Sequence, residues 1–257
     1  MTRNTERATG ARKPAAPPQA NGASDGALSA SRRVYLTLRQ RIVDMVMAPG
    51  TRIVELDIAA EHGLSRTPVH EAVQRLAEEG LIEILQRVGT FVARIPIDQL
   101  EESMLIRTAL EIVIVEKAAA NADAEGVALL RRILAEQQGF ATANDADAFH
   151  RSDEAFHAAL AELAGCPGVW RTIQQTKAQV DRFRRLTLPI EGRMKGVVEE
   201  HTQVVEAIEH GAPQDAVAAM REHLDHVLPV VEMTRSFRPE FFVNRLAVGT
   251  DRKPGSL

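Results

Sequence analysis

The short segment Gly63–Pro68 is the feature that most limits how this 257-residue chain can fold. It reads Gly-Leu-Ser-Arg-Thr-Pro and stands between two stretches whose apolar residues recur at helical spacing. Glycine suits the C-terminal end of a helix, whereas a hydroxyl residue followed by proline suits the start of the next one. The segment therefore predicts a tight turn between a helix over about 55–62 and a helix over about 68–79, which is typical of a helix-turn-helix.

The sequence on both sides of this turn completes a small module. Before it, apolar residues at helical spacing predict a first helix that ends near Pro49. After Gly80 the apolar period shortens to that of strands, and the runs 81–85 and 90–94 flank a turn that contains a glycine. An isolated hairpin is only marginally stable, so we expect it to pack on the three helices. Residues 30–95 are thus predicted to form a winged helix-turn-helix DNA-binding domain.

The third helix carries the side chains that we expect to read DNA. Burying its apolar residues would leave a face of hydrogen-bond donors that can reach base edges or phosphates in the major groove. At the hairpin tip, an arginine on a tight turn suits the narrow minor groove or a phosphate. A polar face can also be merely solvated, so the prediction rests on the helix-turn-helix spacing together with the wing. The predicted DNA-binding residues are Arg66, Thr67, His70, Gln74, Arg87 and Gly89.

The stretch from Val34 to Arg94 resembles the winged helix-turn-helix of GntR-family bacterial transcription regulators. The residues that carry the resemblance are Pro49-Gly50, the run from Gly63 to Val73, Leu76, Glu79-Gly80-Leu81-Ile82 and Gly89-Thr90-Phe91-Val92. This family usually has arginine where the present chain has His70. The departure implies a phosphate or guanine contact there that is weaker or sensitive to pH.

The rest of the chain gives no strand signal and predicts a bundle. From Ile97 onward, amphipathic segments follow one another and are separated by Gly, Pro, Asn or Asp. Helices of this length joined by short turns predict an antiparallel α-bundle, and the fold class is therefore mainly α. The predicted helices cover about 97–121, 123–140, 144–164, 168–187, 191–210 and 213–234.

The composition of the chain predicts which terminal segments lie outside the folded domains and in which compartment the protein resides. Residues 1–29 contain almost no large apolar side chain, so we predict a disordered tail there, and residues 235–257 are predicted to form a C-terminal tail. The chain has one cysteine, Cys166, and its apolar runs fall far short of the roughly 20 residues that span a bilayer. Its net charge is -4, with the positive excess in the N-terminal part. We expect a cytoplasmic protein without a membrane partner.

A second group of candidate residues lies in the predicted bundle. Asp153 and His157 are four residues apart and share one helix face, while His201 and His223 fall on two further helices. Three imidazoles and a carboxylate can converge on a divalent transition metal and leave open positions for water or a ligand. Histidines are more often surface or structural residues, so the pattern alone leaves both interpretations open.

Residues 97–234 resemble the all-helical effector domain of the FadR-type branch of the same family, the form called FCD. The matching positions are Arg107, Asp153-x-x-x-His157, Glu200-His201 with Ala207-Ile208, and His223-Leu224. The resemblance implies that Asp153, His157, His201 and His223 bind a divalent metal such as zinc or nickel, and that the metal takes a small carboxylate metabolite. It also selects Arg107 and Arg182 as the effector-binding residues, because a guanidinium can hold a carboxylate oxygen by two hydrogen bonds.

Together these features predict a ligand-responsive transcription regulator, and not an enzyme. It would bind operator DNA as a homodimer, and the resemblance favours a repressor relieved by an organic acid, although an activator stays open. The main alternative is a metalloenzyme built on the bundle. A di-iron bundle, however, needs Glu-x-x-His on two helices, and only Glu154 to His157 fits. A third possibility is constitutive DNA binding with purely structural histidines.

Overall fold

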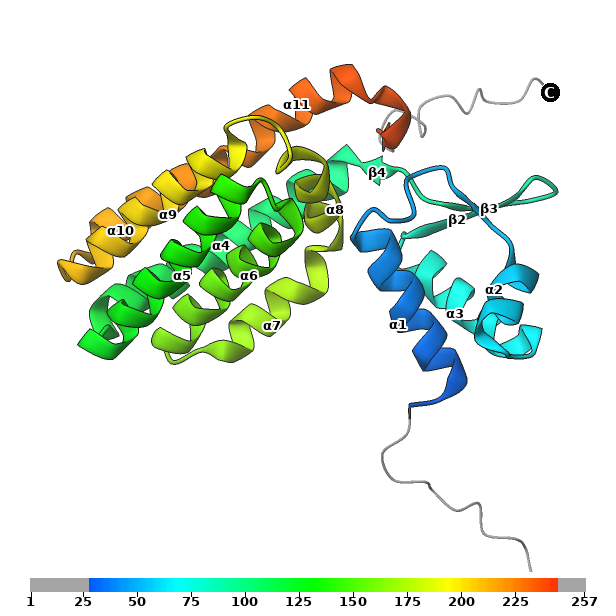
Figure 1. Ribbon diagram of the computed structural model, residues 1–257, viewed down its shortest axis with the longest axis horizontal. Coiled ribbons are helices and arrows are strands. Elements are labelled where there is room, and N and C mark those ends of the chain that lie inside the picture. The colour runs from blue at the N-terminus through cyan, green and yellow to red at the C-terminus, as the bar shows by residue number, and fades with distance from the viewer. Residues whose placement is uncertain (1–27, 245–257) are drawn as a thin grey trace, which may run out of the picture.

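The computed structural model describes residues 28–244, which form two bodies side by side (Figure 1). The smaller, N-terminal body combines helices with a small antiparallel sheet of strand order β1-β3-β2. This is the predicted winged helix-turn-helix, with one strand more than the hairpin that the sequence indicated. Its elements are α1 (Ala30–Val43), β1 (Arg52–Ile53), α2 (Glu55–His62), α3 (Arg66–Glu78), β2 (Ile82–Leu85) and β3 (Gly89–Val92).

Apolar residues at three- and four-residue spacing hold α3 in place. Val69, Val73 and Leu76 are fully buried and belong to the same core as Leu38 and Ile42 of α1. Burial of such a stripe supplies most of the stability of a short helix. The glycine of the turn before α3 has the predicted role. Gly63 ends α2 in the left-handed conformation, at φ 63°.

The larger body is a bundle of helices that run alongside one another (Figure 1). Two of the predicted helices are each broken into two, at Lys177 and at His226. The mainly α fold class is confirmed. The helices are α4 (Ile97–Asn121), α5 (Ala124–Ala143), α6 (Ala146–Leu163), α7 (Pro167–Thr176), α8 (Ala178–Thr187), α9 (Arg193–Glu209), α10 (Pro213–Asp225) and α11 (Val227–Phe237).

The two bodies are joined by a short strand that the sequence did not indicate. Strand β4 (Ile95–Pro96) leads directly into α4 and pairs in parallel with β5 (Phe242–Val243). After α11 the chain therefore returns to the junction through a 3-10 turn, Pro239–Phe241. Two-residue strands carry too little periodicity to be predicted, because they depend on a partner distant in sequence.

The predicted tails lie largely outside the residues that the structure describes. Of 1–29, only residues 28 and 29 are described, and of 235–257 the part up to residue 244 continues the fold as the end of α11, the 3-10 turn and β5. Within residues 28–244, the helices are either too short or too polar to cross a membrane.

Candidate metal centre and nucleic-acid interface

Three histidines meet in the middle of the helical body. His157 comes from α6, His201 from α9 and His223 from α10, and each of the three is at most 1% exposed. One ring nitrogen from each lies within 4.8 Å of the others, and the Nε2 atoms of His201 and His223 are 3.3 Å apart. The fold thus brings together the three histidines that the sequence singled out.

Aromatic neighbours fix the planes of these imidazoles. The ring of Phe156 stacks on His201 at 4.0 Å between centroids, and the indole of Trp170 lies parallel to the ring of His157 at 5.8 Å. Such packing restricts ring rotation and keeps the site apolar around its polar atoms.

Asp153, the fourth candidate ligand, is fully buried beside the histidines. Its two carboxylate oxygens lie 3.8 Å from Nε2 of His201 and 3.9 Å from Nε2 of His157. Oδ1 accepts a hydrogen bond from Arg184, whereas Oδ2 is buried without a hydrogen-bond partner. Burial alone would raise the pKa of Asp153, but Arg184 and the nearby histidines hold it well below its ordinary value. The site therefore contains an ionised carboxylate with one free oxygen.

The opposite nitrogen of each imidazole, Nδ1, faces an oxygen. For His201 and His223 these contacts favour the tautomer with the proton on Nδ1, which leaves a lone pair on Nε2, whereas Nε2 of His157 accepts a hydrogen bond from Arg107. An outer oxygen that orients the ring in this way is the usual support of a metal-binding histidine. The Nδ1-to-oxygen pairs are His157 with Glu111 at 2.5 Å, His201 with Gln137 at 2.9 Å and His223 with Glu200 at 2.6 Å.

The converging Nε2 lone pairs of His201 and His223 fit a bound cation. Two unprotonated Nε2 atoms 3.3 Å apart repel each other unless a proton or a metal lies between them. Burial lowers the pKa of His223 to about 4 and that of His201 well below its ordinary value, so neither ring takes up a proton at neutral pH. Three imidazole nitrogens and a carboxylate oxygen are the donor set of zinc and similar divalent ions.

Two buried arginines border this centre. Arg107 donates from Nη2 to Nε2 of His157 at 2.8 Å and from Nε to Glu111 at 2.5 Å. Burial would raise the pKa of Glu111, but Arg107 and His157 lower it to about 2, so the pair is ionic. Arg184 is the second, through its bond to Asp153.

Arg182, the other predicted effector residue, lies elsewhere in the fold. Its guanidinium donates to the side chain of Gln179 and to the backbone oxygen of Ala93 at the junction of the two bodies. Residues 182 and 184 point in different directions on a helix, and the sequence does not show which side of α8 turns toward the histidines. Sequence analysis therefore missed Arg184. It also missed Glu111, although Arg107 and Glu111 have the four-residue spacing of a helical ion pair.

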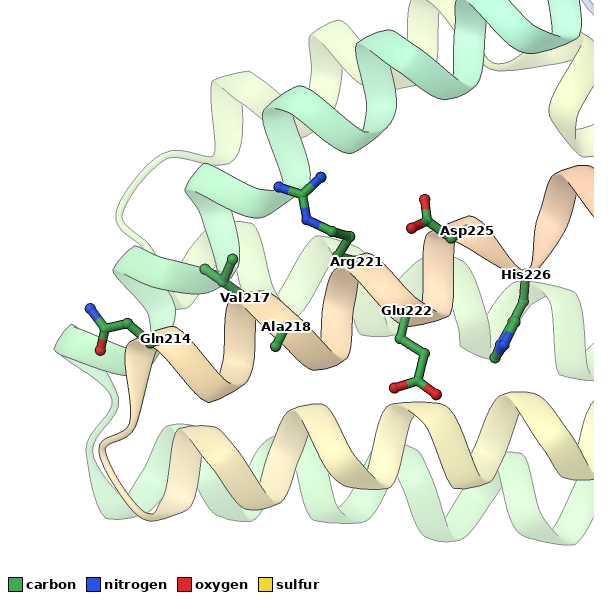
Figure 2. Close-up of a pocket in the computed structure, with 7 residues that line it drawn as sticks. All are labelled: Gln214, Val217, Ala218, Arg221, Glu222, Asp225 and His226. Atoms are coloured by element: carbon green, nitrogen blue, oxygen red, sulfur yellow. The ribbon is translucent and has the colours of Figure 1, made fainter.

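A hollow of about 470 Å³ on the outer surface of α10 lies near the centre. Figure 2 shows Glu222 and His226 directed toward α9, and Arg221 on the opposite side. Nδ1 of His226 is 2.9 Å from one oxygen of Glu200, whose other oxygen contacts His223. His226 thus links the protein surface to a buried imidazole. The hollow is lined by Gln214, Val217, Ala218, Arg221, Glu222, Asp225 and His226.

The predicted DNA-binding residues lie on the outside of the smaller body. Arg66, Thr67, His70 and Gln74 are exposed along one face of α3, opposite its buried stripe. Arg87 is exposed on the turn between β2 and β3, where it adopts the left-handed conformation at φ 63°. The face of α3 and the turn between β2 and β3 that carry these residues are therefore open to solvent.

Glu55, which the sequence analysis did not single out, orders two of these residues. It stands in the first turn of α2, and its carboxylate contacts Nε of Arg66 at 3.0 Å and Nδ1 of His70 at 2.9 Å. Burial tends to raise the pKa of Glu55, but the bonds from His70 and Arg66 lower it. An ionised Glu55 holds both side chains on the outer face of α3.

Comparisons with known proteins place both bodies in one family. The model described as "Bacterial regulatory proteins, gntR family" matches residues 30–92, and the model of the FCD domain matches residues 102–226. The chain belongs to the GntR family of bacterial regulatory proteins and carries an FCD domain. It is a transcriptional regulator and not an enzyme.

Individual relatives agree with this assignment. An uncharacterized HTH-type transcriptional regulator in an unstable DNA locus of Streptomyces ambofaciens is 35% identical over 216 residues, which cover 84% of this chain and 91% of that protein. The HTH-type transcriptional repressor RspR of Escherichia coli K12 is 29% identical over 212 residues, 82% of this chain and 93% of that protein. The solved structure of E. coli McbR/YncC has the same fold, with a TM-score of 0.65 and 20% identity over 80% of this chain and 99% of that one.

Replacing Arg66 with alanine should weaken binding to the DNA that flanks the gene by roughly 1–3 kcal/mol, because an exposed donor at the start of α3 would be lost. The measurement is a salt-titrated binding assay on the full-length protein. A phosphate contact would also lower the salt slope by about one, whereas a base contact would not. Arg131→Ala, an arginine paired with Glu209 on the helical body, is the control. Equal affinities for the two variants would contradict the assignment.

Stability should fall as the pH drops below about 6.5, because the buried imidazole of His150 stays neutral in the folded state. Burial lowers the pKa of His150 to about 4, so in the window from about 6.5 to 4 the unfolded chain binds the extra proton. His150→Gln should reduce the slope of unfolding free energy against pH by up to about 1.4 kcal/mol per pH unit there, measured by urea unfolding. Exposed His210 is the control site, and His210→Gln should keep the wild-type slope. An unchanged slope in His150→Gln would contradict this account.

Proposed function

We propose that this regulator is a metal-dependent sensor of a small carboxylate, which represses transcription by binding operator DNA as a homodimer. The observation that carries the proposal is the meeting of His157, His201 and His223, whose ring nitrogens lie within 4.8 Å of one another. The Nε2 lone pairs of His201 and His223 converge, and every Nδ1 faces an oxygen. A buried histidine that served packing alone would also need an acceptor for its N–H, but it would not need its other nitrogen to face a second imidazole. Asp153, with its free Oδ2, is the proposed fourth ligand.

The residues around the centre suit a carboxylate effector. When bound, zinc or nickel would supply a Lewis-acidic anchor for one carboxylate oxygen. The guanidinium groups of Arg107 and Arg184 lie beside the proposed ligands and could hold the other oxygen. Arg182 was selected by the family resemblance, but its hydrogen bonds at the junction favour Arg184 for this role.

The proposal of repression is supported by a relative, and the proposal of a dimer is supported by symmetry and by an exposed apolar surface. The E. coli relative RspR is named as a transcriptional repressor. A two-fold dimer presents two recognition helices to a palindromic site, and α4 offers an exposed apolar surface for a second copy, with Leu105 72% and Val113 49% exposed. An effector can release operator DNA only if it binds the DNA-competent and incompetent arrangements unequally.

Constitutive DNA binding with structural histidines is the second candidate. The close packing of His157 and His201 against Trp170 and Phe156 favours it, because packed rings also stabilise a core. The two candidates differ in metal content and in the response of DNA binding to organic acids.

Removing one histidine should abolish the response to organic acids, while the variant still binds the flanking DNA. His223→Gln, which nearly preserves side-chain volume, should lower zinc affinity by more than about 100-fold, since loss of a ligand exceeds the effect of losing an outer partner. Metal content would be measured by mass spectrometry, and DNA binding would be titrated with a panel of mono-, di- and tricarboxylates. His210→Gln, an exposed histidine, is the matched control. The sensor is refuted if acid-induced release of DNA survives unchanged in both His201→Gln and His223→Gln.

A further inference from the structure

Helix α8 lies where the two bodies of the molecule meet (Figure 1). Ala178 packs against the core of the DNA-binding body, whereas Val180 and Phe183 are buried in the core of the bundle. In addition, the side chain of Gln179 donates to the backbone oxygen of Gly80 at 3.5 Å. A single short helix thus shares the packing of both domains.

Three arginines of α8 extend from it in different directions. Arg184 bonds Asp153 at the proposed metal centre. Arg182 donates to the backbone oxygen of Ala93 at 2.6 Å, just beyond the wing. Arg185 contacts Asp44, at the end of α1, at 2.6 Å, and it also bonds Asp147 of α6. One helix therefore connects a metal ligand to two points of the DNA-binding body.

The contacts of Arg182 and Arg184 depend on the exact position of the helix because they are buried. Arg182 is completely buried, and its two hydrogen bonds go to uncharged oxygens, of Gln179 and of Ala93, while its Nε has no partner. A buried charge with so few acceptors is costly to displace, since each lost hydrogen bond leaves a desolvated donor. Arg184 is 4% exposed and faces the same constraint.

The ends of α8 allow it to shift as a unit. The chain leaves the helical conformation at Lys177, with φ -91° and ψ 5°, so α8 is separated from α7. Beyond Thr187 the chain turns before α9 and passes through Gly192 in the left-handed conformation, at φ 81°. A ten-residue helix bounded by two breaks can move without bending its neighbours.

We propose that α8 transmits the state of the metal centre to the DNA-binding domain, with Arg184 as the input and Arg182 and Arg185 as the output. This inference deepens the proposed function, on which it rests for its physiological trigger. A carboxylate bound beside Arg184 would compete with Asp153 for the guanidinium. Because the three side chains belong to one helix, a change in the partner of Arg184 displaces the contacts to Ala93 and Asp44. The three arginines are positioning residues.

The first test perturbs the input without any ligand. In full-length Arg184→Gln, hydrogen exchange should accelerate at least about tenfold at the end of α1 and in the segment Gly80–Ala93, because the contacts of Arg182 and Arg185 loosen. Affinity for the flanking DNA should change by roughly 2- to 30-fold. Arg131→Gln on α5, which breaks the ion pair with Glu209 of α9, should change neither quantity.

The second test changes Arg182 and measures metal binding. It can still be done if Arg184→Gln does not fold. Arg182→Met keeps the bulk and removes the bonds to Ala93 and Gln179. Coupling is reciprocal, so zinc affinity of the full chain, measured against a competing chelator, should change by roughly 2- to 30-fold. Arg131→Met is the control and should bind zinc like the wild type.

The role of α8 is overturned if exchange in Arg184→Gln accelerates only within the bundle, or if Arg182→Met binds zinc with wild-type affinity. A wild-type protein that fails to bind zinc would instead refute the proposed sensor. In that case the exchange experiment still decides whether α8 connects the two bodies, because it uses neither metal nor effector.

Discussion

The contact between each buried imidazole and an outer oxygen is the constraint on which the candidate site depends. Glu111, Gln137 and Glu200 face the Nδ1 atoms and thereby direct the Nε2 atoms inward. Without these oxygens, the three rings could rotate. With them, the bundle holds together nitrogen atoms from α6, α9 and α10 that could bind a metal ion.

Ion pairs next to the histidines help the bundle to tolerate buried charges. A buried ion costs less when it is paired and hydrogen-bonded, and Arg107 with Glu111 and Arg184 with Asp153 meet that condition. These pairs surround the histidines, so the centre and its charged border form one polar network in an apolar bundle. Part of this network reaches the DNA-binding body through α8, and part reaches the surface through Glu200 and His226.

The sequence predicted the parts of the structure that depend on local patterns. The glycine turn at Gly63, the apolar stripe of α3 and the spacing of Asp153 and His157 all follow from helical periodicity, and the structure shows each of them. The pairing of β4 with β5 and the choice between Arg182 and Arg184 were out of reach. Both depend on which elements meet in space, and a single sequence does not record that.

X-ray absorption at the zinc edge of the zinc-loaded, full-length protein would test the central claim most directly. The account predicts three imidazole nitrogens at about 2.0–2.1 Å together with at least one oxygen ligand. His157→Gln should reduce the imidazole count by one. A spectrum dominated by oxygen without imidazole scattering, or one unchanged in that variant, would contradict the claim that these three histidines form a metal centre.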